Sequence, residues 1–584
     1  MNINKILKKV AVLALPLTLG VGTGTFTSCA DMLDTKSEMV EFTEDNQLNT
    51  PQDTLYSVMG IIRSMQTIAD RTVLLGELRG DLMVTTDKAS TSLKNLAAFN
   101  LEEENDYNRI ADYYAVINNC NYFIANADTS LMKLQEHIFK KEYAAVKTFR
   151  AWTYLQLAKI YGEVPLVLDP VLTENQAQAE KNKKYSGIQE ICNYFIDDIK
   201  PFVDTDLPMY GEMGGFNSTK FFIPVRVLLG EMCLWANRYQ EAAEYFHNYL
   251  TFKNREQTTG KSYSRWQVGT DLNFSTAGWS SSYTTAISNS RSVENITIIP
   301  LETSEFYGKK GMLENVYNST EYNYYYFQAK PSQGMFDLSA AQDYCYLNKI
   351  TETNMDTIYV PKTDLRRPFY AGDLRLASAY NMNTYNRDET SNYNSENQTI
   401  SKFSETFIPL YRIQQVYLMF AEALNRAGYP ESAFCILKYG LYDMQIDRDL
   451  KYGGISQQER ERAGNLIKFT DDVFKDINTQ GIHARGCGDV TCDTTYCLPM
   501  PETALASYND TVQYQIPLLE DMIVTEMALE SAFEGKRYYD LMRIALRRND
   551  ASYLATPIAR RNGTEDTALK ALLMDKKNWY LPIK

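Results

Sequence analysis

Apolar residues recur at every third or fourth position through much of the chain, and this spacing predicts amphipathic helices. Six segments show the pattern clearly: 54–71, 110–127, 141–162, 226–250, 416–441 and 524–546. The third stops at Gly162, a favourable C-cap, and the following "EVPLVLDP" indicates extended chain. The pattern therefore predicts a mainly α-helical protein.

Two of these segments have the spacing of helical pairs. In 226–250 a large residue and a glycine are followed, after a turn, by an aromatic residue, an alanine and a phenylalanine. The positions concerned are Leu229, Gly230, Tyr239, Ala242 and Phe246. These offsets resemble a tetratricopeptide repeat, in which small residues let two helices approach and large ones fill the gap. Segment 416–441 repeats the offsets at Ala421, Gly428, Ala433 and Leu437. The repeats are irregularly spaced, so we expect divergent helical pairs rather than a regular solenoid.

Residues 251–404 differ from the rest of the chain. They are rich in Ser, Thr and Asn, and 24 of these 154 residues are aromatic, about 16% against 12% for the whole sequence. We expect a loop-rich insertion with short strands, carried by a helical scaffold at about 45–250 and 405–560. Loops on rigid scaffolds commonly carry function. Residues 29–584 are expected to form one domain.

The N-terminus is typical of a bacterial lipoprotein signal. Lys5, Lys8 and Lys9 precede 13 uncharged residues, "VAVLALPLTLGVG", too few for a membrane span of about 20. Ser28 and Cys29 follow where the apolar run ends. We expect cleavage after residue 28 and acylation of Cys29 by fatty acids such as palmitate. Phe26 departs from the usual leucine of such sites.

Charge and motifs exclude several classes of function. A net charge of −14 without a basic run argues against nucleic-acid binding. The three histidines, His137, His247 and His483, form no HExxH pair, and the sequence contains no GxSxG, P-loop or dinucleotide fingerprint. The sequence predicts no enzyme, no cofactor and no metal site, although an Asn-rich acidic loop is compatible with calcium. A hydrolytic carboxylate pair remains an alternative, because 73 acidic residues allow many pairs.

Three cysteines cluster in "GCGDVTCDTTYC", at Cys487, Cys492 and Cys497. Their five-residue spacing is not the CxxC spacing of zinc sites. One disulfide among the three is plausible in an exported loop, and three free thiols are the alternative.

Aromatic and amide side chains in the insertion are candidates for binding sugar. A flat ring covers the apolar face of a sugar, whereas amides and carboxylates bind its hydroxyls. The candidates are Trp266, Trp279, Tyr283, Tyr322, Asn323, Tyr324 and Tyr326. Period-two alternation would place Tyr322, Tyr324 and Tyr326 on one strand face. The alternative for each tyrosine is packing in the insertion's own core.

Charged residues in "FEGKRYYDLMR" are spaced for pairing on a helix. Glu534, Lys536, Arg537, Asp540 and Arg543 stand three or four positions apart, so we expect surface pairs or ties to neighbouring helices. Likewise, Arg79 and Asp81 of "ELRGD" are expected to support a loop rather than bind nutrient.

Several stretches together make the chain resemble SusD/RagB-type lipoproteins of the Bacteroidetes outer membrane. In chain order they are "ADMLDTKSE", "GELRGDLM", "FRAWTYLQLAKIYGEVPLV", "LLGEMCLWANRYQEAAEYF", "GDLRLAS", "IPLYRIQQVYLMFAEALNRAG", "ALESAFEGKRYYDLMR" and "NWYLPIK". The resemblance implies a SusD-like fold with tetratricopeptide-type pairs and a loop-rich ligand-binding part. It also implies capture of an oligosaccharide at the cell surface and delivery to a SusC-like, TonB-dependent β-barrel. Asp31 and Asp34 fit the surface-export signals of such organisms.

The resemblance leaves the cargo open. The family's ligand platform draws on a loop that corresponds to residues 85–95, and "TTDKASTSLKN" contains no aromatic residue for stacking. Peptide binding in the same role therefore remains an alternative. A surface glycan hydrolase and a purely structural scaffold are alternatives of other classes.

Overall fold

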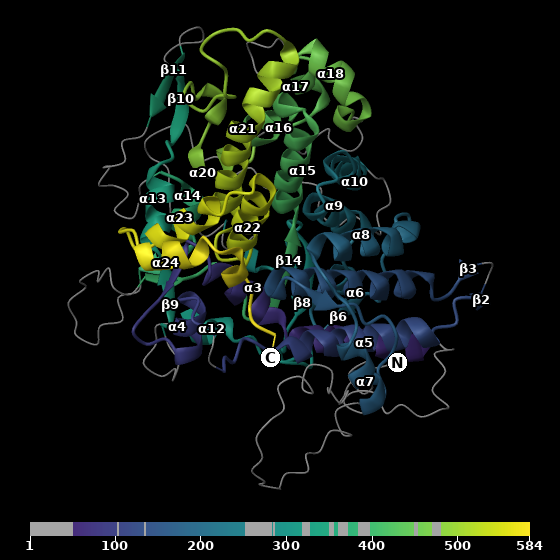
Figure 1. The fold of residues 1–584 in the computed structure, drawn as a ribbon. Helices are drawn as coiled ribbons and strands as arrows, with labels where there is room; N and C mark the ends of the chain where they lie inside the picture. The colour runs from purple at the N-terminus through teal and green to yellow at the C-terminus, as the bar shows by residue number, and fades with distance from the viewer. Residues whose placement is uncertain are drawn as a thin grey trace.

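The computed structural model describes residues 51–101, 104–133, 136–251, 283, 287–317, 327–349, 355–359, 372–382, 398–448, 454–469 and 481–583. Within these ranges the chain is mainly helical, as its apolar spacing predicts (Figure 1). None of the helices described has the length and apolar composition needed to cross a bilayer.

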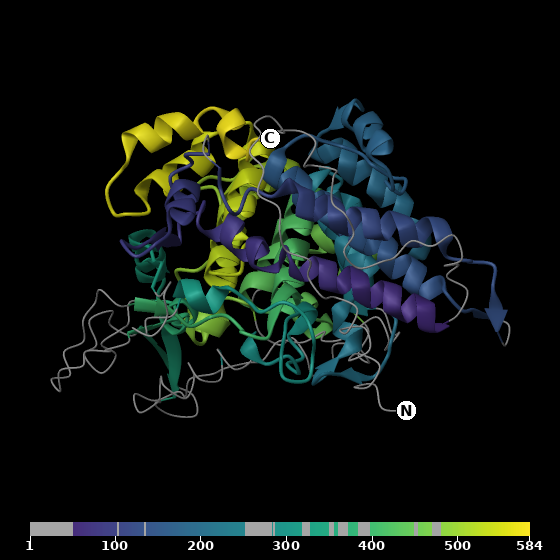
Figure 2. The same cartoon turned by 90° about the horizontal axis from the view of Figure 1, so that it is seen from below.

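The N-terminal helices largely follow the predicted segments. α5 (Ile110–Asn126) and α6 (Lys140–Tyr161) match them closely, and α6 ends at Gly162, whose φ is +80°. The predicted helix at 54–71 is instead two helices, α2 (Pro51–Gln66) and α3 (Ala69–Glu77). The break occurs because the N–H groups at 67 and 68 bond to carbonyls three residues back, which tightens the chain into a turn. α2 lies against α5 (Figure 2).

The predicted helical pairs are confirmed. Segment 226–250 forms α9 (Val225–Trp235) and α10 (Tyr239–Thr251), which pack together. Gly230 allows the close approach, because a β-carbon there would lie 2.5 Å from the Phe246 ring. Segment 416–441 forms α15 (Ile413–Ala427) and α16 (Pro430–Lys438), joined by Gly428 at a φ of +94°.

The helices form a continuous stack that spans the chain on both sides of the insertion. α5, α6, α8 (Ile188–Ile199), α9 and α10 each pack on the next. α10 then packs directly on α15, and α15 packs on α21 (Tyr508–Ser531). The two parts of the scaffold that flank residues 252–412 in the sequence are therefore in direct contact through α10 and α15 (Figure 1).

The predicted helix at 524–546 is wrong as a single helix. α21 ends at Ser531, and α22 (Arg537–Arg548) begins after a sharp turn. Gly535 in this turn has a φ of +81°, and a β-carbon there would lie 2.0 Å from the Thr72 carbonyl oxygen. The close approach of a segment more than 400 residues away thus fixes the position of the break.

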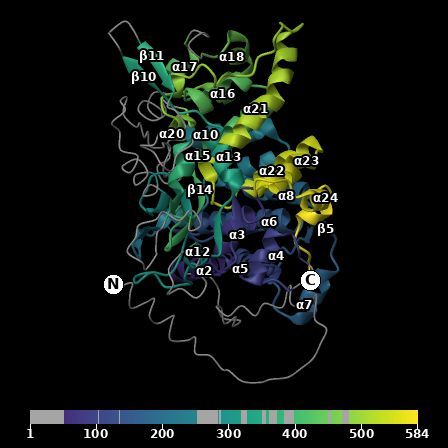
Figure 3. The same cartoon turned by 90° about the vertical axis from the view of Figure 1, so that its left-hand side faces the viewer.

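The strands are short and pair in twos, and every pair is antiparallel. The longest pair joins β8 (Asn295–Pro300) to β14 (Phe407–Arg412), which leads into α15. The hairpin β10 (Cys345–Lys349) and β11 (Met355–Tyr359) stands at the same end of the molecule as α16 (Figure 3). The other strand pairs are β1 (Met83–Thr85) with β9 (Ala329–Pro331), β2 (Met132–Lys133) with β3 (Glu136–His137), β4 (Val164–Pro165) with β5 (Tyr185–Ser186), β6 (Glu212–Met213) with β7 (Phe216–Asn217), and β12 (Tyr380–Met382) with β13 (Gln398–Ile400).

Short helices complete the fold: α4 (Thr91–Ala97), α7 (Glu174–Lys181), α12 (Leu313–Tyr317), α13 (Gln333–Ala340), α14 (Leu374–Ser378), α17 (Asp443–Ile446), α18 (Gln457–Ala463), α20 (Ala484–Cys487), α23 (Ser552–Arg560) and α24 (Thr567–Leu573). One large apolar core runs through the helical stack and includes Trp152 and Trp235. Trp579 in the C-terminal tail is also fully buried, and its indole N–H donates to the Leu573 carbonyl. The C-terminal tail is therefore part of the core.

Candidate functional site

Most of the residues predicted to contact ligand cannot be placed. Trp266, Trp279, Tyr322, Asn323, Tyr324 and Tyr326 lie outside the described residues, as does the predicted lipidation site, Cys29. For these residues the prediction stays a prediction. Tyr283 is the candidate that the structure describes.

Tyr283 lies in the interior rather than on an open surface. Its side chain is 0% exposed, and its hydroxyl lies 3.5 Å from the backbone oxygen of Glu530. The charged ends of Lys402 and Arg485 lie 5.6 and 5.9 Å from its ring centroid. Burial raises the pKa of its phenol well above the usual value. The expectation that Tyr283 stacks on a ligand is therefore wrong in this structure, because packed protein atoms already cover the ring.

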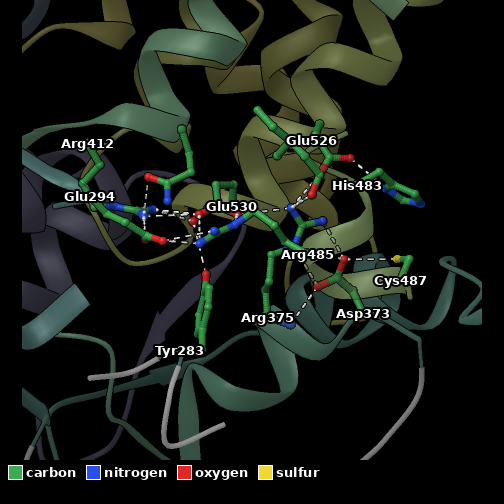
Figure 4. A network of polar contacts seen from close by, with 12 residues as sticks. Tyr283, Glu294, Asp373, Arg375, Arg412, His483, Arg485, Cys487, Glu526 and Glu530 are labelled. Atoms are coloured by element: carbon green, nitrogen blue, oxygen red, sulfur yellow. Dashed lines mark hydrogen bonds and ion pairs between the residues drawn. The ribbon is translucent and has the colours of Figure 1, made fainter. Parts of the chain in front are cut away.

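Tyr283 instead points to a buried cluster of charges centred on Glu530 of α21 (Figure 4). Three arginines from separate segments reach this carboxylate: Arg375 of α14 at 3.2 Å, Arg412 of β14 at 3.2 Å and Arg485 of α20 at 3.1 Å. Glu530 and all three arginines are 0% exposed. One helix thus provides the anion on which three distant segments converge.

Arg375 extends the cluster along α21. Its guanidinium contacts Asp373 at 2.7 Å and Glu526 at 2.6 Å. Glu526 lies one helical turn before Glu530, so both carboxylates face the same side. The Nδ1 atom of His483 lies 2.8 Å from the other oxygen of Glu526 (Figure 4). Asp373 also caps α14, since it accepts the N–H of Arg375.

Arg412 and Arg485 extend the cluster in the other direction. Arg412 contacts Glu534 at 2.6 Å, and Lys402 contacts the same carboxylate at 2.7 Å. Arg485 pairs with Glu294 at 3.2 Å. We call this set the buried charge network, and it comprises Glu294, Asp373, Arg375, Lys402, Arg412, His483, Arg485, Glu526, Glu530 and Glu534.

Proximity to the arginines keeps the network ionised despite its burial. Desolvation opposes the charge on Glu530, but Arg485, Arg412 and Arg375 outweigh it and lower its pKa to about 2. Desolvation also opposes the charge on Arg412, yet Glu534 and Glu530 raise its pKa above the usual value. Buried charges of this kind are tolerable only when each is paired and hydrogen-bonded.

The network binds protein segments together and offers nothing to a substrate. Catalysis requires a group that reaches the reacting atoms, whereas these side chains are enclosed and already satisfied by one another. No group of acidic, histidine or cysteine side chains within the described ranges has the arrangement of a metal site. The arrangement fastens α14, β14 and α20 to α21, and so it positions what those segments carry.

Glu534, Arg537 and Arg543 of "FEGKRYYDLMR" are buried, and Lys536 and Asp540 are half-buried. Arg543 and Asp540 form the expected pair along the helix at 2.9 Å, and the expected ties to other elements are confirmed. Arg537 holds Asp81 through two bonds of 2.6 and 2.8 Å. Arg543 binds Glu422 of α15 at 2.6 Å. Arg79, expected to support a loop, donates to the carbonyl of Trp579 and so ties α3 to the C-terminal tail.

A small cavity lies beside these ties, between α9, β14, α15, α21 and α22. Its lining includes Glu231, Tyr411, Lys536, Asp540 and Arg543, and its volume is about 40 Å³. Water needs roughly 10–15 Å³ of such volume, whereas sites for small molecules occupy about 300–1,000 Å³. The cavity therefore suits water but is too small for a sugar ring.

The clustered cysteines form no disulfide with one another. Cys487, Cys492 and Cys497 are all free thiols in this structure. Cys487 is enclosed and donates to Asp373, and Cys497 is exposed. The three side chains point to different surroundings, so in this structure the alternative of three free thiols holds.

Sequence reasoning missed the buried charge network because its members are far apart along the chain. One signal was available in retrospect. The stretch "GDLRLAS" contains Asp373 and Arg375, and "IPLYRIQQ" contains Arg412. The stretch "ALESAFEG" contains Glu530 and Glu534. The most recognisable stretches are thus the ones that hold the fold together.

Comparisons with known proteins agree with this architecture. A family model described as the SusD family matches residues 135–584. A SusD superfamily protein from Bacteroides vulgatus superposes with a TM-score of 0.54 at 14% identity, over 92% of this chain and 96% of that one. A SusD superfamily protein from Bacteroides thetaiotaomicron gives a TM-score of 0.52 at 17% identity, over 92% and 96% of the two chains.

A third similar structure, a SusD-like carbohydrate-binding protein from Bacteroides fragilis, gives a TM-score of 0.51 at 14% identity, over 86% of this chain and 88% of that one. At such identities these likenesses establish the fold. No curated protein sequence matches the chain.

Proposed function

We propose, from the premise that this chain belongs to the SusD family, that it captures an oligosaccharide at the cell surface and passes it to a SusC-like, TonB-dependent transporter in the outer membrane. The protein would bind its cargo without changing it chemically. Cys29, acylated, would hold it at the membrane.

The observation that carries the proposal is the family match over residues 135–584, which includes most of the helical scaffold and the whole insertion. The carbohydrate-binding protein of the same fold from Bacteroides fragilis supports sugar as the cargo. The aromatic residues of the insertion supply the flat apolar faces that such a cargo needs.

A peptide is the second candidate cargo. Segment 85–95 has no aromatic residue, and in the structure it forms the end of β1, a turn and the start of α4. A surface without rings at this position favours backbone hydrogen bonding over stacking. The role beside the transporter would be the same for either cargo.

The anchor and the partner follow from the family role. Lipid chains contribute about 0.8 kcal/mol per buried CH₂, and more than one chain is needed for stable attachment. A tethered binder meets its membrane partner at a high effective concentration, so a modest affinity suffices. Replacement of Cys29 by serine should release the protein from the membrane, which mass spectrometry and fractionation of cells would detect.

The deciding experiment is a binding screen of residues 30–584, which contain every described element, against purified oligosaccharides and tryptic peptides. A dissociation constant for a glycan supports the proposal, whereas binding only to peptides selects the second cargo. Unaltered glycan after prolonged incubation is expected. New reducing ends would instead identify a hydrolase.

Two tryptophan variants test the binding surface. Trp266→Ala and Trp279→Ala should weaken glycan binding, since stacked aromatic rings contribute strongly where they are desolvated. Tyr514→Ala is the matched control, because Tyr514 is an aromatic residue on α21 that is 40% exposed. If neither tryptophan variant changes the affinity for a glycan that the wild type binds, the assigned surface is wrong. If no glycan and no peptide binds, the protein is a structural scaffold.

A further inference from the structure

The sulfur atoms of Cys345 and Cys492 lie 3.9 Å apart, although 147 positions separate them in the sequence. Cys345 begins strand β10, and Cys492 ends a short 3₁₀ turn after α20. Both side chains are free thiols in this structure. Two thiols in direct contact need only a small adjustment to reach the roughly 2.05 Å of a disulfide bond.

The backbone around the two sulfurs is held in place independently of them. The N–H of Asp489 donates to the Cys345 carbonyl at 2.9 Å, next to a parallel β-bridge between Cys345 and Gly488. Gly488 has a φ of +83°, and a β-carbon there would lie 2.1 Å from the Cys345 carbonyl oxygen. The glycine therefore permits an approach of two chain segments that brings the thiols together.

The second strand of the hairpin, β11, also holds the loop that contains Cys492. The hydroxyl of Thr357 on β11 donates to the Cys492 carbonyl at 3.2 Å, and the hydroxyl of Tyr359 bonds to Asp493 at 3.0 Å. Both strands of the hairpin thus contact residues 488–493. Closure of a disulfide here would involve side-chain rotation and little movement of the backbone.

The other two cysteines of the loop are excluded by their surroundings. The Cys487 thiol is fully buried and donates to Asp373 of the buried charge network at 3.3 Å. The Cys497 thiol is exposed and contacts the Thr494 carbonyl at 3.2 Å. Cys345 is thus the thiol that Cys492 meets.

We propose that Cys345 and Cys492 form a disulfide bond when they react with an oxidant of the disulfide class. This bond would lock the β10–β11 hairpin onto the loop that follows α20. The inference goes beyond the proposed function and is independent of the cargo. It links the hairpin covalently to a segment that Arg485 anchors in the buried charge network.

The two thiols differ in the way that sequential exchange requires. Cys492 is partly exposed, whereas Cys345 is buried. The hydrogen bond with Cys345 lowers the pKa of the Cys492 thiol below its usual value. Cys492 as thiolate attacks one sulfur of oxidised glutathione and releases one glutathione thiolate, which takes up a proton. Cys345, losing its proton, then attacks the Cys492 sulfur and releases the second glutathione, so two electrons pass to the oxidant.

Residues 30–584, purified under reducing conditions, provide the test. The protein is exposed to oxidised glutathione, alkylated under denaturing conditions and digested with an endoprotease that cleaves before aspartate. Such cleavage at Asp489 and Asp493 separates all three loop cysteines, which a tryptic digest would leave in one peptide. The expected product is "DYCYLNKITETNM" (343–355) linked to "DVTC" (489–492), with a mass two hydrogens below the sum of the separate peptides.

Matched serine variants and thiol counting complete the design. The chain holds eight thiols besides Cys29, and the count in denaturant should fall by two on oxidation. The disulfide should also raise the melting temperature, Tm, of the oxidised wild type. Cys492→Ser should abolish both the linked peptide and this rise in Tm, whereas Cys497→Ser should retain both. A link from Cys492 to Cys487 or Cys497, or eight free thiols after oxidation of the folded protein, would overturn the proposal.

Discussion

Replacement of Glu530 by glutamine removes the central charge of the buried charge network while keeping the shape of the side chain. Three arginines then lose their common counter-ion inside the protein, at positions that are 0% exposed. Breaking a buried ion pair by removing one partner costs about 3–5 kcal/mol. The pKa of Glu530 gives a similar figure. A fall from 4.5 to about 2 corresponds to about 3 kcal/mol in favour of the folded state.

The pH dependence identifies charge as the cause. Because the pKa of Glu530 is lowered on folding, its contribution is present above about pH 4.5 and is lost as the pH falls towards about 2. The deficit of Glu530→Gln relative to the wild type should therefore be constant from pH 5 to pH 8. At pH 3 the deficit should be smaller by about 2 kcal/mol, because Glu530 is then protonated in the unfolded wild type but still ionised in most of the folded protein.

Urea unfolding, followed by far-UV circular dichroism and by tryptophan fluorescence, measures this deficit where the two probes give coincident curves. Glu502→Gln is the control, since Glu502 lies in an exposed stretch before α21 and should change the free energy of unfolding by less than about 0.5 kcal/mol. A deficit below about 1 kcal/mol for Glu530→Gln at pH 7 would refute the cohesive role of the network. A full deficit that persists at pH 3 would assign the loss to packing.

Three further predictions concern the surrounding scaffold. Burial raises the pKa of Glu77 to about 7, so its contribution to stability is fully present below about pH 4.5 and is lost as the pH rises through 7. Glu77→Gln should therefore flatten the decline in the free energy of unfolding between pH 5 and 8, and an unchanged slope would count against this. Gly230→Ala should cost about 1–3 kcal/mol in urea titrations, because its β-carbon must displace the buried Phe246 ring, and wild-type stability would disprove the contact. Arg537→Lys loses the two-bond grip on Asp81 and should lower the unfolding free energy by about 1–3 kcal/mol, whereas a neutral result would show that charge alone suffices.

Local features of the fold could be predicted from the sequence because their causes lie within a few residues. The α9–α10 pair depends on Gly230 and Phe246, which are 16 positions apart and face each other across one turn. The end of α6 depends on Gly162, the next residue. Both effects leave a mark in the order of apolar and small residues.

Other features could not be predicted because their causes lie elsewhere in the chain. The break between α21 and α22 follows from the contact of Gly535 with Thr72, and apolar periodicity runs across it without interruption. The burial of Tyr283 depends on neighbours such as Lys402 and Glu530. A tyrosine among serines and threonines looks exposed in the sequence, and only the tertiary contacts reveal the opposite.

The predicted disulfide shows the same limit in a sharper form. The spacing of Cys487, Cys492 and Cys497 predicts a partner within the loop, because the three are close together in the sequence. The contact of Cys492 is instead with Cys345, on a strand that the sequence alone does not bring near. The fold, and not the spacing of the cysteines, brings these two thiols together.

These contacts also explain how the insertion is joined to the helical scaffold. α10 packs on α15, so the helical stack is continuous without residues 252–412. Within that span Arg375, and at its end Arg412, converge on Glu530 of α21. Loss of either arginine leaves buried carboxylates short of a counter-ion and costs stability directly.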